Sequence, residues 1–496
     1  MRTDRSNFIF NSAALTIYSI VVLFAMKHHE LWGDEIHSWN IAKGSKSLTE
    51  LFSNIRYEGH PPVWYIILFS VTRFTHSLFF LKAAQFAFVA ATAFLFLFFS
   101  PFSKIEKLLL LCGYYFIYEY AVLSRNYMPA IFFAFSIAVL QSRSFKYKLT
   151  VYYFLLLLLS NVHLLGLLLA VGIHAGYCFT AFTSKNKFTM HLLAGIVIFL
   201  PAVYFILPPS DSQLNFAFWV EHWSVSRLFM FITVVTRSYF PMPGASDLHW
   251  WNSHYFLDNH SIISLFICVF IFCSVMILIY MIARKNKNVF VIVSVNLILT
   301  FFLSLIFPLN TARYAGFALI GLIVACWMGD STTDPADGNL RPVRKILVLI
   351  LLLQIPMGVF AIIKDRVQKF SSAQMVVEMQ KQIPPGSFVA TDYWCLNNLS
   401  AFLDSEFYCV ELQRPAFFLT WNSEMRNISS YDYVEGLNHL QVRIADQIFY
   451  FYSRHNMSEL TANSASVLHC RLTLIQDSGE SIEKSGRVFL YKVERN

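Results

Sequence analysis

A succession of long apolar runs, separated by short basic segments, constrains the fold of this chain more than any other feature of its sequence. An α-helix needs about 20 apolar residues to cross a bilayer, and a helix satisfies its backbone polar groups internally. Only 14% of the 496 residues are charged, against about 25% in an ordinary soluble domain. We therefore predict an all-α polytopic membrane protein with about 11 to 13 transmembrane helices. The runs lie near 8–26, 82–100, 108–122, 127–141, 149–160, 163–182, 188–207, 261–283, 289–307, 312–328 and 344–363.

The basic residues between the runs predict an orientation. If the runs alternate across the bilayer, these residues fall on one side, which the positive-inside rule makes cytoplasmic. Because they orient the spans, the net charge of +8 does not indicate a nucleic-acid partner. The basic residues concerned are Arg2, Arg5, Lys104, Lys107, Arg143, Lys146, Lys148, Lys185, Lys187, Arg284, Lys285, Lys287, Arg341, Arg344 and Lys345.

Two further apolar segments, 61–76 and 226–240, are shorter than a perpendicular span requires. If both crossed, the basic loops between them would face outward. We therefore predict that they are interfacial or re-entrant, or that each pairs with a short span that the pattern does not reveal. The same count places most unusual polar residues on one outer face, in segments 27–81, 119–126, 160–163, 208–260 and 308–313.

The tail beyond residue 364 has a different character. Its apolar content falls, and strand-type runs alternate with helix-type stretches at 373–382 and 433–445. We predict two domains: a transmembrane domain, 1–364, with outer loops 27–81 and 208–260, and a small extracytoplasmic α/β domain, 365–496. The strand-type runs are Ser387–Ala390 and Arg487–Tyr491.

The eight cysteines show no metal-binding spacing. Five of them lie in apolar runs, where cysteine behaves as a small hydrophobe. Cys395, Cys409 and Cys470 lie in the tail. One disulfide among these three is compatible with the sequence, but the pairing stays open.

Two adjacent carboxylates, Asp34 and Glu35, follow directly after the first apolar run. Charges so close to a bilayer are costly unless they face water, a partner or a substrate. An exposed carboxylate there can act as a general base and accept a proton from an incoming hydroxyl or amine. The alternative is that these are ordinary polar residues at the end of a helix, which is the more common explanation for a lone Asp-Glu pair.

The stretch Glu58-Gly59-His60-Pro61-Pro62 is the second unusual polar segment. Its Pro-Pro pair imposes a stiff, extended turn. This turn would hold Glu58 and His60 at the membrane interface. The alternative is a loop that merely starts a helix, since proline is common at the first helical position.

Together these features resemble the large-loop (GT-C) membrane glycosyltransferases. The likeness rests on an acidic pair in the first outer loop, a later Pro-Pro-x-x-Tyr turn and a short apolar segment after it. The chain is most similar to the bacterial branch with protein O-mannosyltransferases and the lipid A aminoarabinose transferase, over roughly 8–330. The resemblance implies a polyprenyl-phosphate sugar donor and a glycolipid, glycan or protein acceptor. It also implies a bacterial inner membrane, with the site and the C-terminal domain on the extracytoplasmic side.

The segment Tyr118–Tyr127 lies between two runs on the predicted outer side. The family commonly has an acidic residue followed by Arg-x-Tyr here, and Arg125 and Tyr127 match. Leu123 stands where the acidic residue is expected, and Glu119 lies six residues before Arg125. On a continuing helix, Glu119 and Leu123 share a face. Glu119 then either orients the substrate or forms a structural ion pair with Arg125.

The segment Asn161-Val162-His163 interrupts a long apolar stretch, also on the predicted outer side. The family often carries a histidine near this turn that faces the donor, so the resemblance implies that His163 orients the substrate. The alternative is a turn between two helices with a hydrogen-bonded histidine.

Arg313 and Tyr314 begin a late apolar run and resemble a phosphate-contacting arginine of the family. A guanidinium is a planar fork that matches phosphate oxygens and stays charged. We expect Arg125 and Arg313, with Tyr127 and Tyr314, to bind the donor phosphate. The alternative is that Arg313 extends toward lipid headgroups.

The long loop 208–260 is predicted to form a lid or an acceptor-side wall. Its tryptophans would suit sugar rings, but an aromatic belt at the interface explains most of them. Its histidines lack the i,i+4 spacing of a metal site, so no metal is predicted, although some members of the superfamily use a divalent cation. The residues concerned are Glu221, His222, Trp223, His249, Trp250, Trp251 and His254.

The leading hypothesis is an inverting glycosyltransferase. The resemblance implies that Asp34 is the general base, that Glu35 positions Asp34 or binds a sugar hydroxyl, and that Glu58 and His60 orient the substrates. The rival hypothesis is a transporter or flippase for a lipid-linked saccharide, but such proteins bind near the bilayer midplane and often have repeated halves. A third is an inactive relative that scaffolds envelope assembly.

Overall fold

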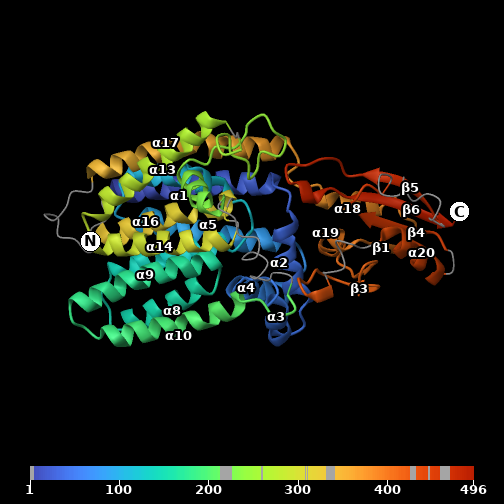
Figure 1. The fold of residues 1–496 in the computed structure, drawn as a ribbon, viewed down its shortest axis with the longest axis horizontal. Helices are drawn as coiled ribbons and strands as arrows, with labels where there is room; N and C mark the ends of the chain where they lie inside the picture. The colour runs from blue at the N-terminus through green and yellow to red at the C-terminus, as the bar shows by residue number, and fades with distance from the viewer. Residues whose placement is uncertain are drawn as a thin grey trace.

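The computed structural model describes residues 5–212, 226–258, 261–307, 309, 311–330, 341–424, 432–444, 447–457 and 470–495. A helical body and a smaller C-terminal domain lie end to end along the long axis of the molecule (Figure 1). Glu221, His222 and Trp223, which we placed in a lid or acceptor-side wall, lie outside the described residues.

The helical body comprises the helices from α1 to α17, with one π-helical turn. In chain order they are α1 Arg5–His28, α2 Gly33–Gly44, α3 Leu48–Ile55, α4 Val63–Thr72, α5 Phe79–Phe99, α6 Lys104–Cys112, η1 Tyr115–Glu119, α7 Tyr127–Gln141, α8 Lys148–Ser160, α9 Leu164–Thr183, α10 Phe188–Ile206, α12 Ser226–Tyr239, α13 Ile262–Ala283, α14 Lys287–Ile306, α15 Ala312–Ala315, α16 Phe317–Asp330 and α17 Arg341–Val367.

Within the described residues, eight helical segments are long and apolar enough to cross a membrane: α1, α5, α9, α10, α13, α14, α15 with α16, and α17. Three shorter apolar helices, α4, α7 and α8, accompany them. The protein is an integral, multi-pass membrane protein, as predicted. The ambiguous segments correspond to α4, with 10 residues, and α12, with 14. At about 1.5 Å per residue, neither reaches across a hydrocarbon core of about 30 Å.

The apolar run 108–122 is not the continuous span that we predicted. α6 ends at Cys112, and Gly113 takes an extended conformation. The chain then makes the π-helical turn η1, which is closed by a hydrogen bond of 2.8 Å from Tyr120 N–H to the carbonyl of Tyr115. Such turns are often found at functional sites, and this one leads into the loop that carries a predicted site arginine.

The C-terminal domain is an α/β domain built on one sheet with strand order β3-β2-β1-β4-β6-β5. β1 pairs in parallel with β2 and β4, and the other pairs are antiparallel. Parallel neighbours need a crossover, which α19 supplies between β1 and β2. The elements are η2 Ala373–Met375, α18 Val376–Gln380, β1 Phe388–Thr391, α19 Tyr393–Leu403, β2 Phe407–Cys409, β3 Arg414–Ala416, α20 Tyr433–Arg443, β4 Phe449–Ser453, β5 Cys470–Asp477, η4 Lys484–Gly486 and β6 Phe489–Arg495.

All eight cysteines are free, so none of the tail cysteines forms the disulfide that the sequence left open. The domain is instead held by apolar packing on both faces of its sheet.

The C-terminal domain docks on α2 through α19. Asn40 Nδ2 donates to the carbonyl of Asn397 across 2.8 Å. One helical turn further along α2, Lys43 pairs with Asp404. These contacts place the domain directly over the first outer loop, which carries the acidic pair.

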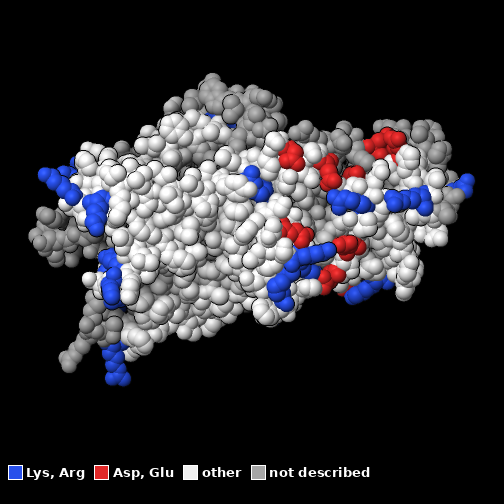
Figure 2. Space-filling model, turned by 90° about the horizontal axis from the view of Figure 1, so that it is seen from below, with Lys and Arg blue, Asp and Glu red and all other residues white. Residues whose placement is uncertain are grey.

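Charged side chains are unevenly distributed over the molecule. Figure 2 shows lysines and arginines without acidic side chains at the end of the helical body opposite the C-terminal domain, whereas acidic and basic side chains are mixed at and beside that domain. A broad band of the helical body between them shows no charged side chains in this view. This distribution agrees with a body embedded in a bilayer and with basic loops grouped at one end.

Candidate active site

A cavity of about 240 Å³ lies where the helical body meets the C-terminal domain. Helix α2 and the loops that follow α3, η1 and α8 contribute its polar walls, and the ends of α9, α10 and α14 contribute its apolar walls. The lining residues are Asp34, His37, Glu58, Gly59, His60, Arg125, His163, Leu164, Leu165, Ile206, Leu303, Phe307, Leu309, Tyr314 and Trp421.

Asp34 presents its carboxylate to this cavity from the first turn of α2. Its Oδ2 accepts from Arg313 Nη1 at 2.8 Å and lies 3.9 Å from Arg125 Nη2. The Asp34 side chain is 41% exposed, whereas those of Arg125 and Arg313 are 7% and 15% exposed. Burial alone would raise the pKa of Asp34, but the charges of Arg313 and Arg125 outweigh it and lower that pKa. Asp34 is therefore an ionised group that opens into the cavity.

Arg125 is fixed against the same helix. Its Nη1 donates to the backbone carbonyl of Asp34 and, at 2.9 Å, to Ser38 Oγ. Its Nε–H has no partner among the described residues. The guanidinium is thus held in one orientation while part of its donor capacity stays unused.

Arg313 is enclosed by aromatic rings. Its guanidinium carbon lies 5.0 Å from the ring centroids of Trp32 and Tyr314 and 5.7 Å from that of Trp251. Such cation–π contacts stabilise a guanidinium that has left water. They hold the positive charge of Arg313 beside the Asp34 carboxylate.

His37 faces the cavity one turn after Asp34 on α2. Its Nε2 lies 2.9 Å from Glu58 Oε1, and its Nδ1 lies 2.9 Å from the amide nitrogen of Asn397. Burial would lower the pKa of His37, but the Glu58 carboxylate outweighs this effect and raises it. Glu58, His37 and Asn397 therefore form a chain that joins the outer loop to the C-terminal domain.

His60 and His163 stack with ring centroids 5.1 Å apart. His163 Nδ1 accepts from Leu165 N–H at 2.9 Å and so caps α9. His60 Nδ1 and His163 Nε2 have no partner among the described residues. Burial and the nearby Arg125 lower the pKa of His60 to about 3 and that of His163 well below its usual value. These shifts favour neutral rings. His163 forms the hydrogen-bonded turn of the alternative prediction and also lines the cavity, and its substrate-orienting role stays a prediction.

Glu35 does not line the cavity, so it is not placed to bind a sugar hydroxyl there, and of its two expected roles the positioning of Asp34 stays a prediction. Its side chain is fully buried. Its Oε2 accepts from Trp32 N–H at 3.1 Å and lies 3.0 Å from His29 Nε2, and its Oε1 accepts from Ser124 N–H at 2.5 Å. Consecutive helical residues point about 100° apart, so Glu35 faces the core while Asp34 faces the cavity.

Glu119 is also buried away from the cavity, against our substrate-orienting assignment. Its Oε2 accepts from Tyr114 Oη at 2.7 Å and from Trp251 Nε1 at 3.1 Å. Within the described residues no Glu119–Arg125 ion pair forms either. The π-helical turn accounts for this placement, because it rotates Glu119 away from the face that a regular helix would give it.

Of the two predicted tyrosines, Tyr314 lines the cavity and Tyr127 does not. Tyr127 is buried, with its ring centroid 4.8 Å from that of His163. Its ring packs against His163, one of the two stacked histidines.

Two lining residues with polar side-chain atoms, His37 and Trp421, were not among the predicted site residues. His37 belongs to the same motif as Asp34, and its spacing of three residues could have revealed it. Trp421 comes from the C-terminal domain, and no local pattern indicates that it returns to this cavity.

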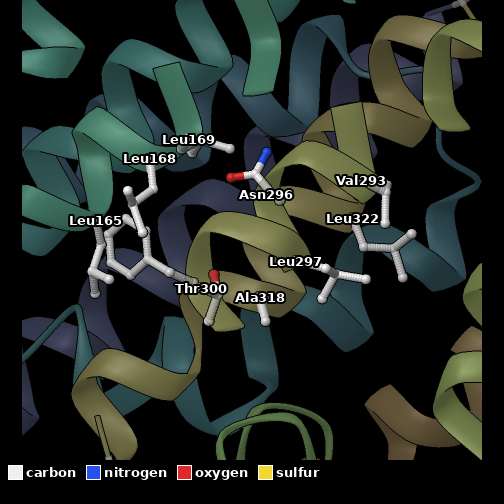
Figure 3. A pocket seen from close by; sticks show the side chains of 11 residues that line it. Leu165, Leu168, Leu169, Val293, Asn296, Leu297, Thr300, Ala318 and Leu322 are labelled. Carbon is white, nitrogen blue, oxygen red and sulfur yellow. The ribbon is translucent and has the colours of Figure 1, made fainter. Parts of the chain in front are cut away.

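A much smaller apolar cavity lies between α9, α14 and α16 and shares Leu165 with the candidate site (Figure 3). Its volume of about 10 Å³ is near the limit for one water molecule. It has no room for a ligand. No group of three or more His, Cys, Asp or Glu side chains in the described part of the chain is arranged to hold a metal ion.

Two solved structures share this fold over nearly the whole chain. ArnT from Cupriavidus metallidurans bound to undecaprenyl phosphate aligns with a TM-score of 0.52 and 12% identity, covering 98% of this chain and 97% of that one. The apo structure of ArnT aligns with a TM-score of 0.52, 11% identity and the same coverage. No family model and no curated protein matches the chain. The GT-C fold that the sequence resemblance implied is therefore confirmed.

Proposed function

We propose that this protein is a GT-C glycosyltransferase that transfers a sugar from a polyprenyl-phosphate donor to a glycolipid, glycan or protein acceptor. The observation that carries the proposal is the ionised Asp34 carboxylate, which opens into a cavity beside two guanidinium groups. The fold shared with ArnT, which was solved bound to undecaprenyl phosphate, supports the choice of donor.

In the proposed reaction Asp34 is the general base. It takes the proton from an acceptor hydroxyl or amine as that group attacks the anomeric carbon of the sugar. The bond between the anomeric carbon and the phosphate oxygen breaks, and polyprenyl phosphate leaves with the electron pair. A direct displacement of this kind inverts the anomeric carbon.

Arg125 and Arg313 would hold the donor phosphate and stabilise the charge that develops on it. Without donor, Arg313 is paired with Asp34. A donor phosphate that competes for the Arg313 guanidinium would weaken its pair with Asp34. The pKa of Asp34 would then rise, and the carboxylate would become a stronger base. Donor binding would then prepare the base for the acceptor.

The remaining polar groups would orient the two substrates. The free Nδ1 of His60 can donate or accept one hydrogen bond, whereas the free Nε2 of a neutral His163 can only donate, because its Nδ1 already accepts from Leu165 N–H. Glu58 and His37 offer a further fixed pair. We assign Glu35 and Glu119 to positioning, because Glu35 accepts from Trp32 N–H, Glu119 accepts from Trp251 Nε1, and both tryptophan rings lie against Arg313.

The apolar wall of the cavity suits a lipid-linked donor. Leu164 and Leu165 begin α9, and Leu303 lies near the end of α14. Both helices are candidate spans, so an isoprenoid chain could lie along the bilayer while its phosphate enters the polar cavity. The polar cluster lies at the end of the helical body and not in its middle, which does not favour the transporter hypothesis.

We also propose that the cavity and the C-terminal domain lie on the extracytoplasmic side of a bacterial inner membrane. The described basic loop residues, such as Lys104, Lys146 and Arg284, support this orientation through the positive-inside rule. External labelling of a single cysteine at position 378, which is exposed on α18 of the C-terminal domain, tests it, and labelling from the cytoplasm would contradict it.

The catalytic proposal is tested with purified Asp34→Asn protein. We expect release of undecaprenyl phosphate from a panel of undecaprenyl-phosphate sugars, in the presence of a membrane-lipid extract as acceptor, to fall by about 10²- to 10⁴-fold. Binding of undecaprenyl phosphate, followed by native mass spectrometry, should persist. Glu378→Gln is the matched control, since this exposed carboxylate on α18 pairs with the exposed Lys381. Full turnover by Asp34→Asn would contradict the proposal.

A further inference from the structure

A second cavity, of about 600 Å³, lies between α1, α5 and the C-terminal domain. It shares no lining residue with the candidate active site. Leu23 and Met26 of α1 and Ala83 and Phe86 of α5 form its apolar wall, and Phe402 of α19 closes it on the side of the C-terminal domain.

The position of this cavity points to the bilayer surface. Both α1 and α5 are candidate membrane spans, and the cavity lies at the C-terminal end of α1 and the N-terminal end of α5. Leu23 and Phe79 on its wall are exposed, Phe79 by 69%. The cavity therefore opens toward lipid chains, with a polar domain above it.

Two ammonium groups lie on the same wall. Lys27, in the last turn of α1, is exposed and has no hydrogen bond or ion pair within the described chain. Lys82 donates to the carbonyls of Met26 at 2.9 Å and His29 at 2.6 Å. An ammonium has three N–H donors, so Lys82 retains one.

The charge of Lys82 is partly offset by the carboxylates of Glu35, Asp365 and Glu30, and Glu30 follows this end of α1. Its Oε1 accepts from Gln374 Nε2 at 3.5 Å, and its charge interacts with Lys369. Lys27, which has no such partner within the described chain, therefore supplies positive charge on this wall at the depth of lipid headgroups.

We propose that this cavity binds an anionic phospholipid of the surrounding membrane. Its phosphate would lie between Lys27 and Lys82, and an acyl chain would follow Leu23, Ala83 and Phe86. Free phosphate would leave the apolar wall unused, and a zwitterionic lipid would bring a second cation toward the lysines. The inference is independent of the proposed transfer reaction.

Occupancy of the cavity should stabilise the turn between α1 and α2. Leu31 lines the lipid cavity, and Asp34, three residues later, lines the candidate active site. Lys82 also holds the carbonyl of His29, whose ring bonds Glu35. A phosphate that fixes Lys82 would thereby fix the start of α2.

The experiment uses the full chain in detergent micelles. Phosphatidylglycerol and phosphatidylcholine are added at equal mole ratios, and retained lipid is measured by native mass spectrometry. We expect a preference for phosphatidylglycerol that falls by about fivefold when Lys27→Gln removes one ammonium. Inorganic phosphate at the same concentration should not displace the lipid.

Two further variants test whether lipid retention depends on this cavity and not on surface charge in general. Ala83→Trp fills the apolar part of the cavity without touching either lysine and should also reduce retention. Lys146→Gln removes an exposed lysine at the opposite end of the body and should leave retention unchanged. Equal retention of both lipids, displacement by inorganic phosphate, or an unchanged preference in both Lys27→Gln and Ala83→Trp would overturn the proposal.

Discussion

Arg313 donates from Nη1 to Oδ2 of Asp34 across 2.8 Å, although 279 residues separate them in the chain. The pair joins α2, in the first outer segment, to α15, near the end of the helical body. A charged pair that is partly shielded from water needs further partners, and Arg125 and the rings around Arg313 supply them. This relationship makes both the charge state of Asp34 and the position of Arg313 testable.

Two substitutions of Arg313 should separate the contribution of its positive charge to transfer from that of its planar guanidinium. Arg313→Ala removes a donor aimed at the phosphate, and we expect transfer to fall by about 10²- to 10³-fold. Arg313→Lys keeps the charge but loses the planar fork, so its transfer rate should lie between those of Arg313→Ala and the unmodified protein. Release of undecaprenyl phosphate measures both.

Arg414→Ala is the control for this pair of variants, because Arg414 is an exposed residue that pairs only with Glu424 in the C-terminal domain. It should retain full transfer. Equal rates for Arg313→Lys and the unmodified protein would show that the fork is not used.

The pH dependence of transfer should report the pKa of Asp34. Because this pKa is lowered, the carboxylate stays ionised through the neutral range, and transfer should fall only when the pH drops through that lowered value. Arg313→Ala removes a cause of the lowering, so its acid limb should move to higher pH. If the pH–rate profiles of Arg313→Ala and the unmodified protein have the same acid limb, Asp34 is not the group whose titration controls the rate.

Much of the candidate site could be predicted because topology places loops on one face before any contact is known. Asp34, Glu58, Arg125, His163 and Arg313 lie on loops that the alternation of apolar runs assigned to one side, and the structure brings all five together. Loop assignment needs only the period of the hydrophobic pattern, which is a strong signal.

The features that could not be predicted depend on how each helix is rotated about its axis and on how the C-terminal domain docks on the helical body. Asp34 and Glu35 are equivalent in sequence, and only the start of α2 decides which one faces the cavity. Glu119 was misplaced because a π-helical turn adds a residue that no periodicity reveals. Trp421 and Asn397 reach the site through the docking of a separate domain, which local patterns do not encode.

The buried His29 should make stability depend on pH. Its Nδ1 lies 2.8 Å from Asp365 and its Nε2 lies 3.0 Å from Glu35. Burial would lower the pKa of His29, but these carboxylates outweigh it and raise the pKa to about 9. The stabilisation is therefore complete below about pH 6.5 and is lost as the pH rises through about 9.

The measurement compares thermal unfolding of the unmodified protein with that of His29→Gln. The variant should unfold at a lower temperature at pH 7, and the difference should shrink by about pH 10. A difference that stays constant with pH would mean that His29 is neutral throughout.

Gly316 should be required for the position of Arg313. A Cβ at residue 316 would lie 2.4 Å from Tyr115 Cε1 and from Tyr120 Oη, and Tyr120 Oη donates to the carbonyl of Arg313 at 2.9 Å. Gly316→Ala must displace these rings, so we expect a loss of about 1–3 kcal/mol and reduced transfer. Gly321→Ala is the matched control on the next helix, because its nearest neighbour lies at an ordinary 3.7 Å. Thermal unfolding and transfer should both be close to unmodified in Gly321→Ala, and equal behaviour of the two variants would contradict the packing argument.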